Sequence, residues 1–243
     1  AGSGIGREVV LRLAAEGAHV VVADRAEQAA ADVAGEAAAL SSKESQVGCS
    51  GTNNDIDATV RCLNALGADI VYNNGVFNVK PVTLPVIGER LLDAGESGAT
   101  LRFMLPVACA LGADAAFKMG GRLPERPLSP LYEELMAHGC ALSPYGMNPL
   151  HLSGHLKSGR YIMPGDISSQ FISGLLLALP LLAGDSVIKI TGALESKPYI
   201  DMTIAALKEY GVIIKPGHHG YTVKGRQHYT PPHNVNVEGD WSN

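Results

Sequence analysis

The sequence lacks an apolar run long enough to cross a membrane. A helix needs roughly 18 apolar residues in a row to span a bilayer, whereas the apolar stretch FISGLLLALPLLAG is shorter and contains Pro180. The N-terminus also lacks a basic segment followed by a signal-like cleavage site. These absences predict a cytoplasmic protein with no membrane partner.

The sequence also has few features of nucleic-acid-binding, disulfide-bonded or metal proteins. Its formal net charge is −5, whereas nucleic-acid partners favour basic patches. His218 and His219 are adjacent in PGHHGY, but that stretch has the composition of a turn, so a metal role has little support. No C-x-x-C pair occurs, which favours reduced, structural thiols. The four cysteines are Cys49, Cys62, Cys109 and Cys140.

Apolar residues and turn formers are abundant. Hydrophobic residues make up 46% of the chain and charged residues 18%, with 28 glycines and 14 prolines. This composition is typical of a globular protein with many turns. At 243 residues, the chain could form one large domain or two small ones.

A repeat runs through the chain. The segments LNALGADIVYNNGVFNV, EELMAHGCALSPYGMNPLHLSG and AALKEYGVIIKPGHHGYTVKG each read as a helix that ends at a glycine, followed by strand, turn and strand. The three glycines are Gly67, Gly139 and Gly211, and both 139 − 67 and 211 − 139 equal 72. Two upstream apolar helices end at Gly112 and Gly184, again 72 residues apart.

Each repeat unit therefore reads helix, strand, helix, strand, strand. A strand ahead of the first helix would make the unit βαβαββ. Three such units predict an α/β fold with pseudo-threefold symmetry, in which sheets surround buried apolar helices.

Two of the predicted helices begin with polar residues. Ser97 in GESGATLRF is a candidate helix cap, and Ser168 and Ser169 precede the equivalent helix one repeat later. Free N–H groups and the positive end of the helix dipole make such termini candidate anion sites. A well-capped core helix explains the same residues, and the two interpretations remain open at this point.

Four motifs in this order, GESGATLRF, GRLPERPL, GDISSQF and ESKPYID, resemble the N-terminal half of the 5-enolpyruvylshikimate-3-phosphate synthase family. Related UDP-N-acetylglucosamine enolpyruvyl transferases typically carry a cysteine in the loop that matches GGRLPERP, and this sequence has none there. The resemblance implies an inverted-barrel domain of the enolpyruvyl transferase type.

The resemblance also implies a reaction. The carboxyvinyl group of phosphoenolpyruvate would move to the 5-hydroxyl of shikimate 3-phosphate, with release of phosphate and without a metal or organic cofactor. The two partners would therefore be shikimate 3-phosphate and phosphoenolpyruvate, in the shikimate pathway of aromatic amino acid biosynthesis.

Seven residues match the family's substrate-binding positions, and no catalytic residue is assigned. Gly98 and Arg126 would face phosphoenolpyruvate, because glycine permits close backbone approach and arginine can donate two hydrogen bonds to a carboxylate or phosphate. The residues implied on the shikimate side are Ser168, Ser169, Gln170, Ser196 and Tyr199.

Structural roles remain open for some of these positions. Ser168 could serve only as a helix cap, and Tyr199 could be an ordinary packing residue. Arg102 lies one helical turn after Gly98 and could be a structural ion-pair partner.

Residues 1–45 depart from this pattern. The stretch AGSGIGREVVLRLAAEGAHVVVADR resembles the nucleotide-binding start of a short-chain dehydrogenase, with Asp24 where an acidic residue would meet ribose. That family's Tyr-x-x-x-Lys pair is absent from the chain. We expect an atypical βα segment over 1–45 and the enolpyruvyl transferase domain over 46–243. The first helix of unit one is either 4–16 or 26–39.

The matched motifs cover one domain of a two-domain enzyme. In the family the active site forms between two similar domains, and the groups that transfer protons come mostly from the other one. We therefore expect a complementing C-terminal domain for activity. Two alternatives remain: a catalytically silent shikimate-3-phosphate binding module, and an NAD(P)-binding dehydrogenase fragment.

Overall fold

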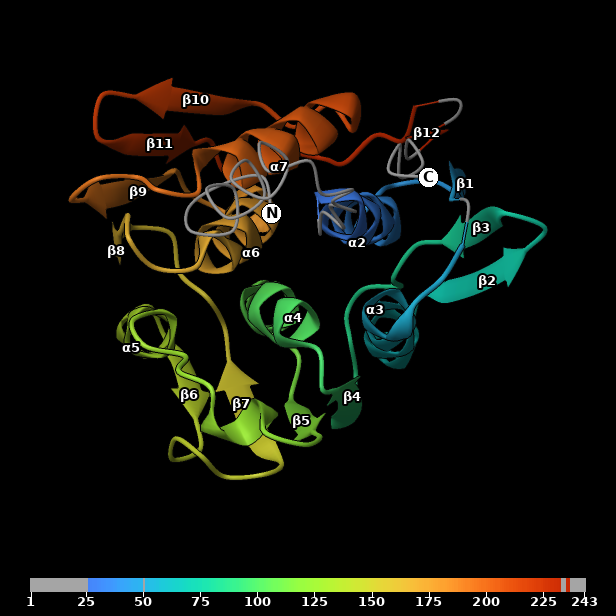
Figure 1. Cartoon of the computed structure of the whole chain (residues 1–243), viewed down its shortest axis with the longest axis horizontal. Coiled ribbons are helices and arrows are strands. Elements are labelled where there is room, and N and C mark those ends of the chain that lie inside the picture. The colour runs from blue at the N-terminus through green and yellow to red at the C-terminus, as the bar shows by residue number, and fades with distance from the viewer. Residues whose placement is uncertain (1–25, 50, 233–234, 237–243) are drawn as a thin grey trace, which may run out of the picture.

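The computed structural model describes residues 26–49, 51–232 and 235–236, and these form an α/β fold. Helices gather in the middle of the molecule, and the sheets lie around them (Figure 1). The described strands form three separate four-stranded sheets rather than one closed barrel. Throughout the same ranges, no helix is both long and apolar enough to cross a bilayer.

Units two and three have the predicted βαβαββ order. Both sheets have the same topology: the first two strands of the unit are parallel and the remaining neighbours are antiparallel. The elements of unit two are β4 (Arg90–Gly95), α4 (Gly98–Ala110), β5 (Ala115–Met119), the short helix η1 (Leu123–Glu125), α5 (Leu131–Ala137), β6 (Cys140–Leu142) and β7 (Leu150–Gly154). Those of unit three are β8 (Arg160–Pro164), α6 (Ser169–Ala178), η2 (Leu179–Leu181), β9 (Ser186–Thr191), α7 (Lys197–Glu209), β10 (Ile214–Gly217) and β11 (Gly220–Val223).

Unit one takes its leading strand from the far end of the described chain. Its other elements are α2 (Ala26–Ala39), β1 (Ser45–Gly48), α3 (Asn54–Ala65), β2 (Asp69–Asn73) and β3 (Val76–Lys80). The strand β12 (Val235–Asn236) pairs parallel with β1, in the place that β4 and β8 take in the other units. The sheet order β12-β1-β3-β2 therefore repeats the topology of units two and three.

The structure resolves the choice of first helix in unit one. The alanine-rich stretch 26–39 forms α2, which packs against α3 and α7. The stretch 4–16 lies outside the described residues, as does the segment that resembles a dehydrogenase. Helix α2 therefore belongs to the first repeat unit, although it falls within 1–45; the boundary between residues 45 and 46 stays a prediction.

Glycines end the second helix of every unit, as the spacing predicts. Gly67, Gly139 and Gly211 have φ angles of 108°, 99° and 77°. A residue with a Cβ rarely adopts this left-handed conformation, which turns the chain out of the helix and into the next strand. The 72-residue spacing thus reflects a conformational requirement at equivalent places in the fold.

Helices α4 and α6 cross closely in the core. Gly174 of α6 faces the backbone of α4: a Cβ there would overlap the carbonyl oxygen of Arg102 and would lie 2.9 Å from Pro106 Cγ. Both helices are buried on nearly all sides, since no residue of α4 after Arg102 and none of α6 after Gln170 is more than slightly exposed. This crossing fixes the N-termini of α4 and α6 relative to each other.

Candidate substrate-binding site

Two serine-capped helix N-termini form the base of the candidate site. The Ser97 hydroxyl oxygen accepts a hydrogen bond from the backbone N–H of Thr100 at 3.1 Å, at the start of α4. At the start of α6, Ser168 Oγ accepts a longer bond, 3.4 Å, from the N–H of Gln170. The remaining free N–H groups of these first turns add positive potential where the helices begin.

Two arginines converge at the start of α4. A Cβ built on Gly98 would lie 3.1 Å from Arg126 Nη1 and 3.4 Å from Arg102 Nη1. Neither guanidinium forms an ion pair with a carboxylate in the described part of the chain. Two like charges held together without an acidic partner attract an anion.

Arg102 is the more enclosed of the two. Its Nη1 donates to Gln170 Oε1 at 2.7 Å, and its guanidinium lies 5.2 Å from the centre of the Phe171 ring. Its Nε is buried and has no hydrogen-bond partner among the described residues. Burial lowers the pKa of Arg102, and the neighbouring charge of Arg126 lowers it further, although an arginine stays charged at neutral pH.

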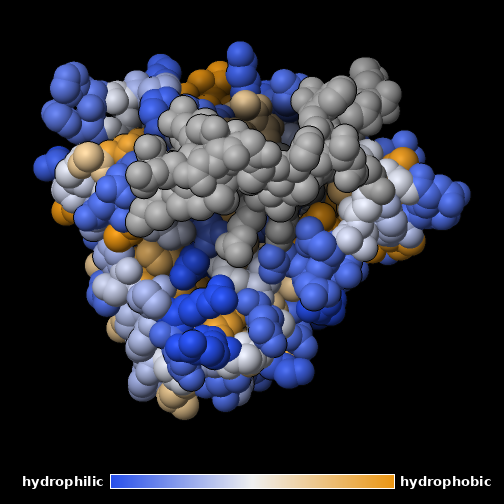
Figure 2. Space-filling view, in the orientation of Figure 1, coloured by the Kyte–Doolittle hydropathy of each residue, from blue (hydrophilic) through white to orange (hydrophobic). Residues whose placement is uncertain are grey.

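Arg126 lies on an exposed loop whose backbone is held from two sides. Its N–H donates to the carbonyl of Leu123 at 3.1 Å, and its carbonyl accepts from the Tyr145 hydroxyl at 2.8 Å. The flanking prolines, Pro124 and Pro127, restrict the loop further. Figure 2 shows hydrophilic residues in the lower middle of this face, near the place where α4 lies in Figure 1.

The loop before α7 lies against the loop before α6. The N–H of Glu195 donates to the carbonyl of Gly165 at 3.1 Å, and a side chain at Gly165 would overlap the carbonyl oxygen of Ala193. Ser196 directly follows this contact, and Tyr199 is in the first turn of α7. The start of α7 is therefore a neighbour of the start of α6.

The seven predicted residues thus fall into two adjoining groups. Contacts through Arg102 connect Gly98, Arg126 and Gln170, and Gln170 adjoins Ser168 and Ser169 at the start of α6. Ser196 and Tyr199 are at the start of α7, joined to the first group through the loop contact at Gly165. That all seven bind substrate stays a prediction.

Sequence reasoning missed the placement of Arg102. The possibility that Arg102 forms a structural ion pair is wrong for the described residues. Its guanidinium instead bonds to the amide of Gln170 and approaches a second arginine. Its spacing of one helical turn from Gly98 was the only signal in the sequence. That spacing indicates which end of α4 the side chain is near, but not which partner it meets.

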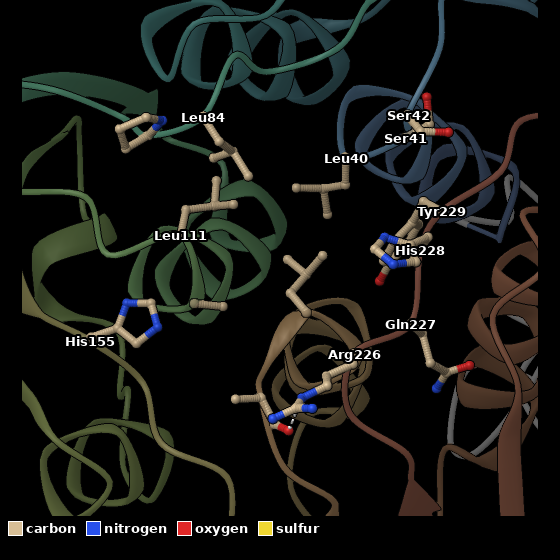
Figure 3. A pocket seen from close by; sticks show the side chains of 14 residues that line it. Leu40, Ser41, Ser42, Leu84, Leu111, His155, Arg226, Gln227, His228 and Tyr229 are labelled. Carbon is tan, nitrogen blue, oxygen red and sulfur yellow. Dashed lines mark hydrogen bonds between the residues drawn. The ribbon is translucent and has the colours of Figure 1, made fainter.

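A separate hollow lies at the C-terminal ends of α2 and α4. It has a volume of about 880 Å³, and Leu40, Leu111 and Leu181 line it where α2, α4 and η2 finish (Figure 3). Arg226 Nε donates there to the carbonyl of Ala183 at 2.9 Å. This hollow is therefore remote from the predicted binding residues.

The predicted turn with two histidines forms the tip of the hairpin between β10 and β11. His218 Nδ1 and His219 Nε2 are 3.1 Å apart. No group of three or more histidine, cysteine, aspartate or glutamate side chains is arranged to hold a metal ion in the described ranges. The four cysteines are all buried and unpaired.

Comparisons with known proteins agree on one family. The family model described as EPSP synthase (3-phosphoshikimate 1-carboxyvinyltransferase) matches residues 34–243. The 3-phosphoshikimate 1-carboxyvinyltransferase of Clostridium kluyveri is 40% identical over 207 residues, which cover 84% of this chain and 48% of that protein. The protein of the same name from Clostridium acetobutylicum is 38% identical over 211 residues, covering 84% and 49%.

A solved structure supports the fold. EPSP synthase from Acinetobacter baumannii superposes with a TM-score of 0.74 at 20% identity, over 90% of this chain and 49% of that one. The chain thus spans about half the length of the proteins it matches.

Proposed function

Because the chain belongs to the EPSP synthase (3-phosphoshikimate 1-carboxyvinyltransferase) family, we propose that it supplies one half of the site for carboxyvinyl transfer. In this reaction the 5-hydroxyl oxygen of shikimate 3-phosphate forms a bond to C2 of the enolpyruvyl group. The bond between that carbon and the phosphate oxygen breaks, and inorganic phosphate and the hydroxyl proton leave. The observation that carries the proposal is the pair Arg102 and Arg126 at the start of α4, which forms no ion pair with a carboxylate among the described residues.

The arginine pair suits phosphoenolpyruvate, which carries a carboxylate and a phosphate. Arg126 has an exposed guanidinium and a constrained backbone, so it can donate two parallel hydrogen bonds to either group. Gly98 leaves room beside it, because a Cβ would crowd Arg126 Nη1 at 3.1 Å. The first turn of α4 adds dipole charge of the required sign.

The serine-rich turn of α6 and the start of α7 suit shikimate 3-phosphate. Ser168 and Ser169 offer hydroxyl donors at a helix N-terminus, an arrangement that binds phosphate without adding bulk. Ser196 and Tyr199 would add hydroxyl donors from the neighbouring loop. Gln170 lies between this group and the arginines, where its amide could contact both substrates.

Proton transfer requires a further contribution. The residues proposed above mainly bind, and a general acid or base must be positioned at the reacting atoms. Since the chain spans about half the length of its relatives, we propose that a complementing C-terminal domain supplies these groups. The chain alone would then bind shikimate 3-phosphate and turn over poorly.

The test is phosphate release from both substrates, measured with the chain alone and mixed with the C-terminal half of a full-length relative. Calorimetric titration of the chain with shikimate 3-phosphate accompanies it. We expect binding by the chain alone and turnover only in the mixture. A chain that binds shikimate 3-phosphate but never turns over in the mixture would instead be a silent binding module. A chain that does neither contradicts the proposal.

A further inference from the structure

A buried hydroxyl pair joins the two helices on the shikimate side. Ser173 of α6 and Thr203 of α7 have their hydroxyl oxygens 2.7 Å apart, and the residues are only 2% and 3% exposed. A hydroxyl in an apolar interior is unfavourable unless it is hydrogen-bonded. The pair satisfies this requirement and fixes one helix relative to the other.

The direction of the bonds can be assigned. Thr203 Oγ1 donates to the carbonyl of Tyr199 at 3.1 Å, and a hydroxyl has a single proton to donate. Ser173 must therefore donate to Thr203. The resulting chain of two hydrogen bonds runs from α6 to the first turn of α7, where Tyr199 is.

The positions of Ser173 and Thr203 along their helices connect the hydroxyl pair to the candidate site. Ser173 is one helical turn after Ser169, and Thr203 is one helical turn after Tyr199. A bond between Thr203 and the carbonyl one turn earlier also adjusts the curvature of the helix at that turn. The pair thus sets both the spacing of the two N-terminal turns and the direction in which the first turn of α7 points.

A similar pair joins units one and two. Thr59 of α3 takes the place that Thr203 takes two repeats later, and its hydroxyl is 2.8 Å from that of Thr100 in α4. The Thr100 hydroxyl oxygen is also 2.8 Å from Ser97 Oγ, beside the start of that helix. The second helices of units one and three are therefore both tied by a threonine to an apolar first helix, close to its N-terminus.

We propose that Ser173 and Thr203 are positioning residues for shikimate 3-phosphate. Neither touches the substrate; together they hold Tyr199 and Ser196 at the correct spacing from Ser168 and Ser169. This inference rests on the proposed function. It adds that the affinity of the shikimate side depends on a hydrogen-bonded contact in the core between α6 and α7.

The experiment is calorimetric titration of the full 243-residue chain with shikimate 3-phosphate, together with the melting temperature of each variant. Thr203→Val removes both hydrogen bonds while keeping the shape, and we expect roughly three- to tenfold weaker binding, as loss of one or two buried bonds implies. Thr203→Ser restores the hydroxyl and should bind within about twofold of wild type. Ser173→Ala should weaken binding less than Thr203→Val, because Thr203 can still bond to Tyr199.

The matched control is Ser186→Ala. Ser186 is a buried hydroxyl in the same unit, 1% exposed, and its oxygen accepts from the N–H of Gly159 at 3.3 Å, away from the start of α6. We expect it to lower the melting temperature without changing affinity. Equal loss of affinity in Ser186→Ala and Thr203→Val would overturn the inference, because general destabilisation would then explain both.

The remaining outcomes separate the two proposals. If wild type binds and Thr203→Val binds equally well, the positioning role is wrong and the proposed function stands. If wild type does not bind shikimate 3-phosphate, the proposed function fails and the positioning role fails with it. Should Thr203→Val not fold, unchanged affinity in Ser173→Ala would still contradict the inference.

Discussion

Helices α2 and α6 are the first helices of units one and three, yet their buried faces differ in kind. The interior of α6 is apolar apart from the hydrogen-bonded hydroxyl of Ser173, and Leu175, Leu176 and Leu177 are fully buried. Helix α2 places Asp32 and Glu36 in its interior, at 2% and 0% exposure. Leu176 lies two 72-residue repeats after Asp32, so one structural position holds a leucine in one unit and a carboxyl group in the other.

The carboxyl groups of α2 have no basic partner in the described part of the chain. None of their four oxygens forms a hydrogen bond there. Burial raises the pKa of Asp32 to about 8, with a further contribution from Asp55 that the nearby Thr59 hydroxyl only partly offsets. Burial also raises the pKa of Glu36 well above its usual range, and Asp32 adds to that effect.

The comparison shows what the repeat requires. Helix ends and their spacing fix where a helix packs, whereas the chemical nature of its buried face can vary at a cost in stability. Helix α6, which is apolar inside and polar at its N-terminus, meets both the packing and the binding requirements. Helix α2 meets the packing requirement, but burial favours the neutral form of its two carboxyl groups.

The largest expected effect is on the pH dependence of folding. Because the pKa of Asp32 is about 8 in the folded state and 3.8 is its ordinary value, the unfolded chain releases this proton at a lower pH than the folded one. The contribution of Asp32 to the free energy of unfolding should therefore be greatest below about pH 4 and fall as the pH rises to about 8. Asp32→Leu should remove up to about 5 kcal/mol of this dependence, as measured by urea unfolding at pH 5, 7 and 9.

A surface carboxylate provides the control for this comparison. Asp69 is 58% exposed and pairs with Lys80 at 2.7 Å, so Asp69→Asn should leave the pH dependence almost unchanged. If Asp32→Leu follows the same pH curve as Asp69→Asn, the contrast between α2 and α6 has no energetic consequence.

The second prediction concerns the glycine of α6. Gly174→Ala places a Cβ against the Arg102 carbonyl and 2.9 Å from Pro106 Cγ, so α4 and α6 must move apart. We expect the free energy of unfolding to fall by about 3 kcal/mol, as overpacking in a close crossing implies. Denaturant unfolding measures this, and a loss below that of an ordinary surface substitution would show that the crossing can relax.

The third prediction concerns the binding of phosphoenolpyruvate at the N-termini of α4 and α6. Arg126→Gln keeps a hydrogen-bonding side chain but removes the charge, so affinity for phosphoenolpyruvate should fall roughly 10- to 100-fold, in line with loss of a charged hydrogen bond. Calorimetry with shikimate 3-phosphate present measures it. Arg122→Gln is the matched control, because Arg122 is 86% exposed and paired with Glu125. If the two substitutions lowered the affinity equally, Arg126 would not be a binding residue for phosphoenolpyruvate.

The smallest effect is expected at the glycine of α2. A Cβ on Gly35 would meet no atom of the described residues within 4 Å, unlike one on Gly174. Gly35→Ala should therefore stabilise the protein by about 0.5–1 kcal/mol through helix propensity. Thermal unfolding of Gly35→Ala and Gly174→Ala, measured side by side, tests this difference between the two glycines. If both substitutions destabilise the protein, α2 is packed as tightly as α6.

Local patterns made much of the fold predictable. The terminal glycines at positions 67, 139 and 211 and the capping serines Ser97 and Ser168 are requirements of single turns of backbone, so they are visible in the sequence. Their spacing gave three units and the order of elements within them. The motifs at the start of α4 and α6 indicated the end of the helices where the candidate site lies.

The sequence by itself determined where helices begin and end, because φ angles and caps depend on a few neighbouring residues. Only the tertiary structure decided that β12 completes the sheet of unit one, that Arg102 meets Gln170 and approaches Arg126, and that Asp32 is enclosed. These outcomes depend on which distant segments meet and how much water their packing excludes. The spacing of residues along one chain does not contain that information.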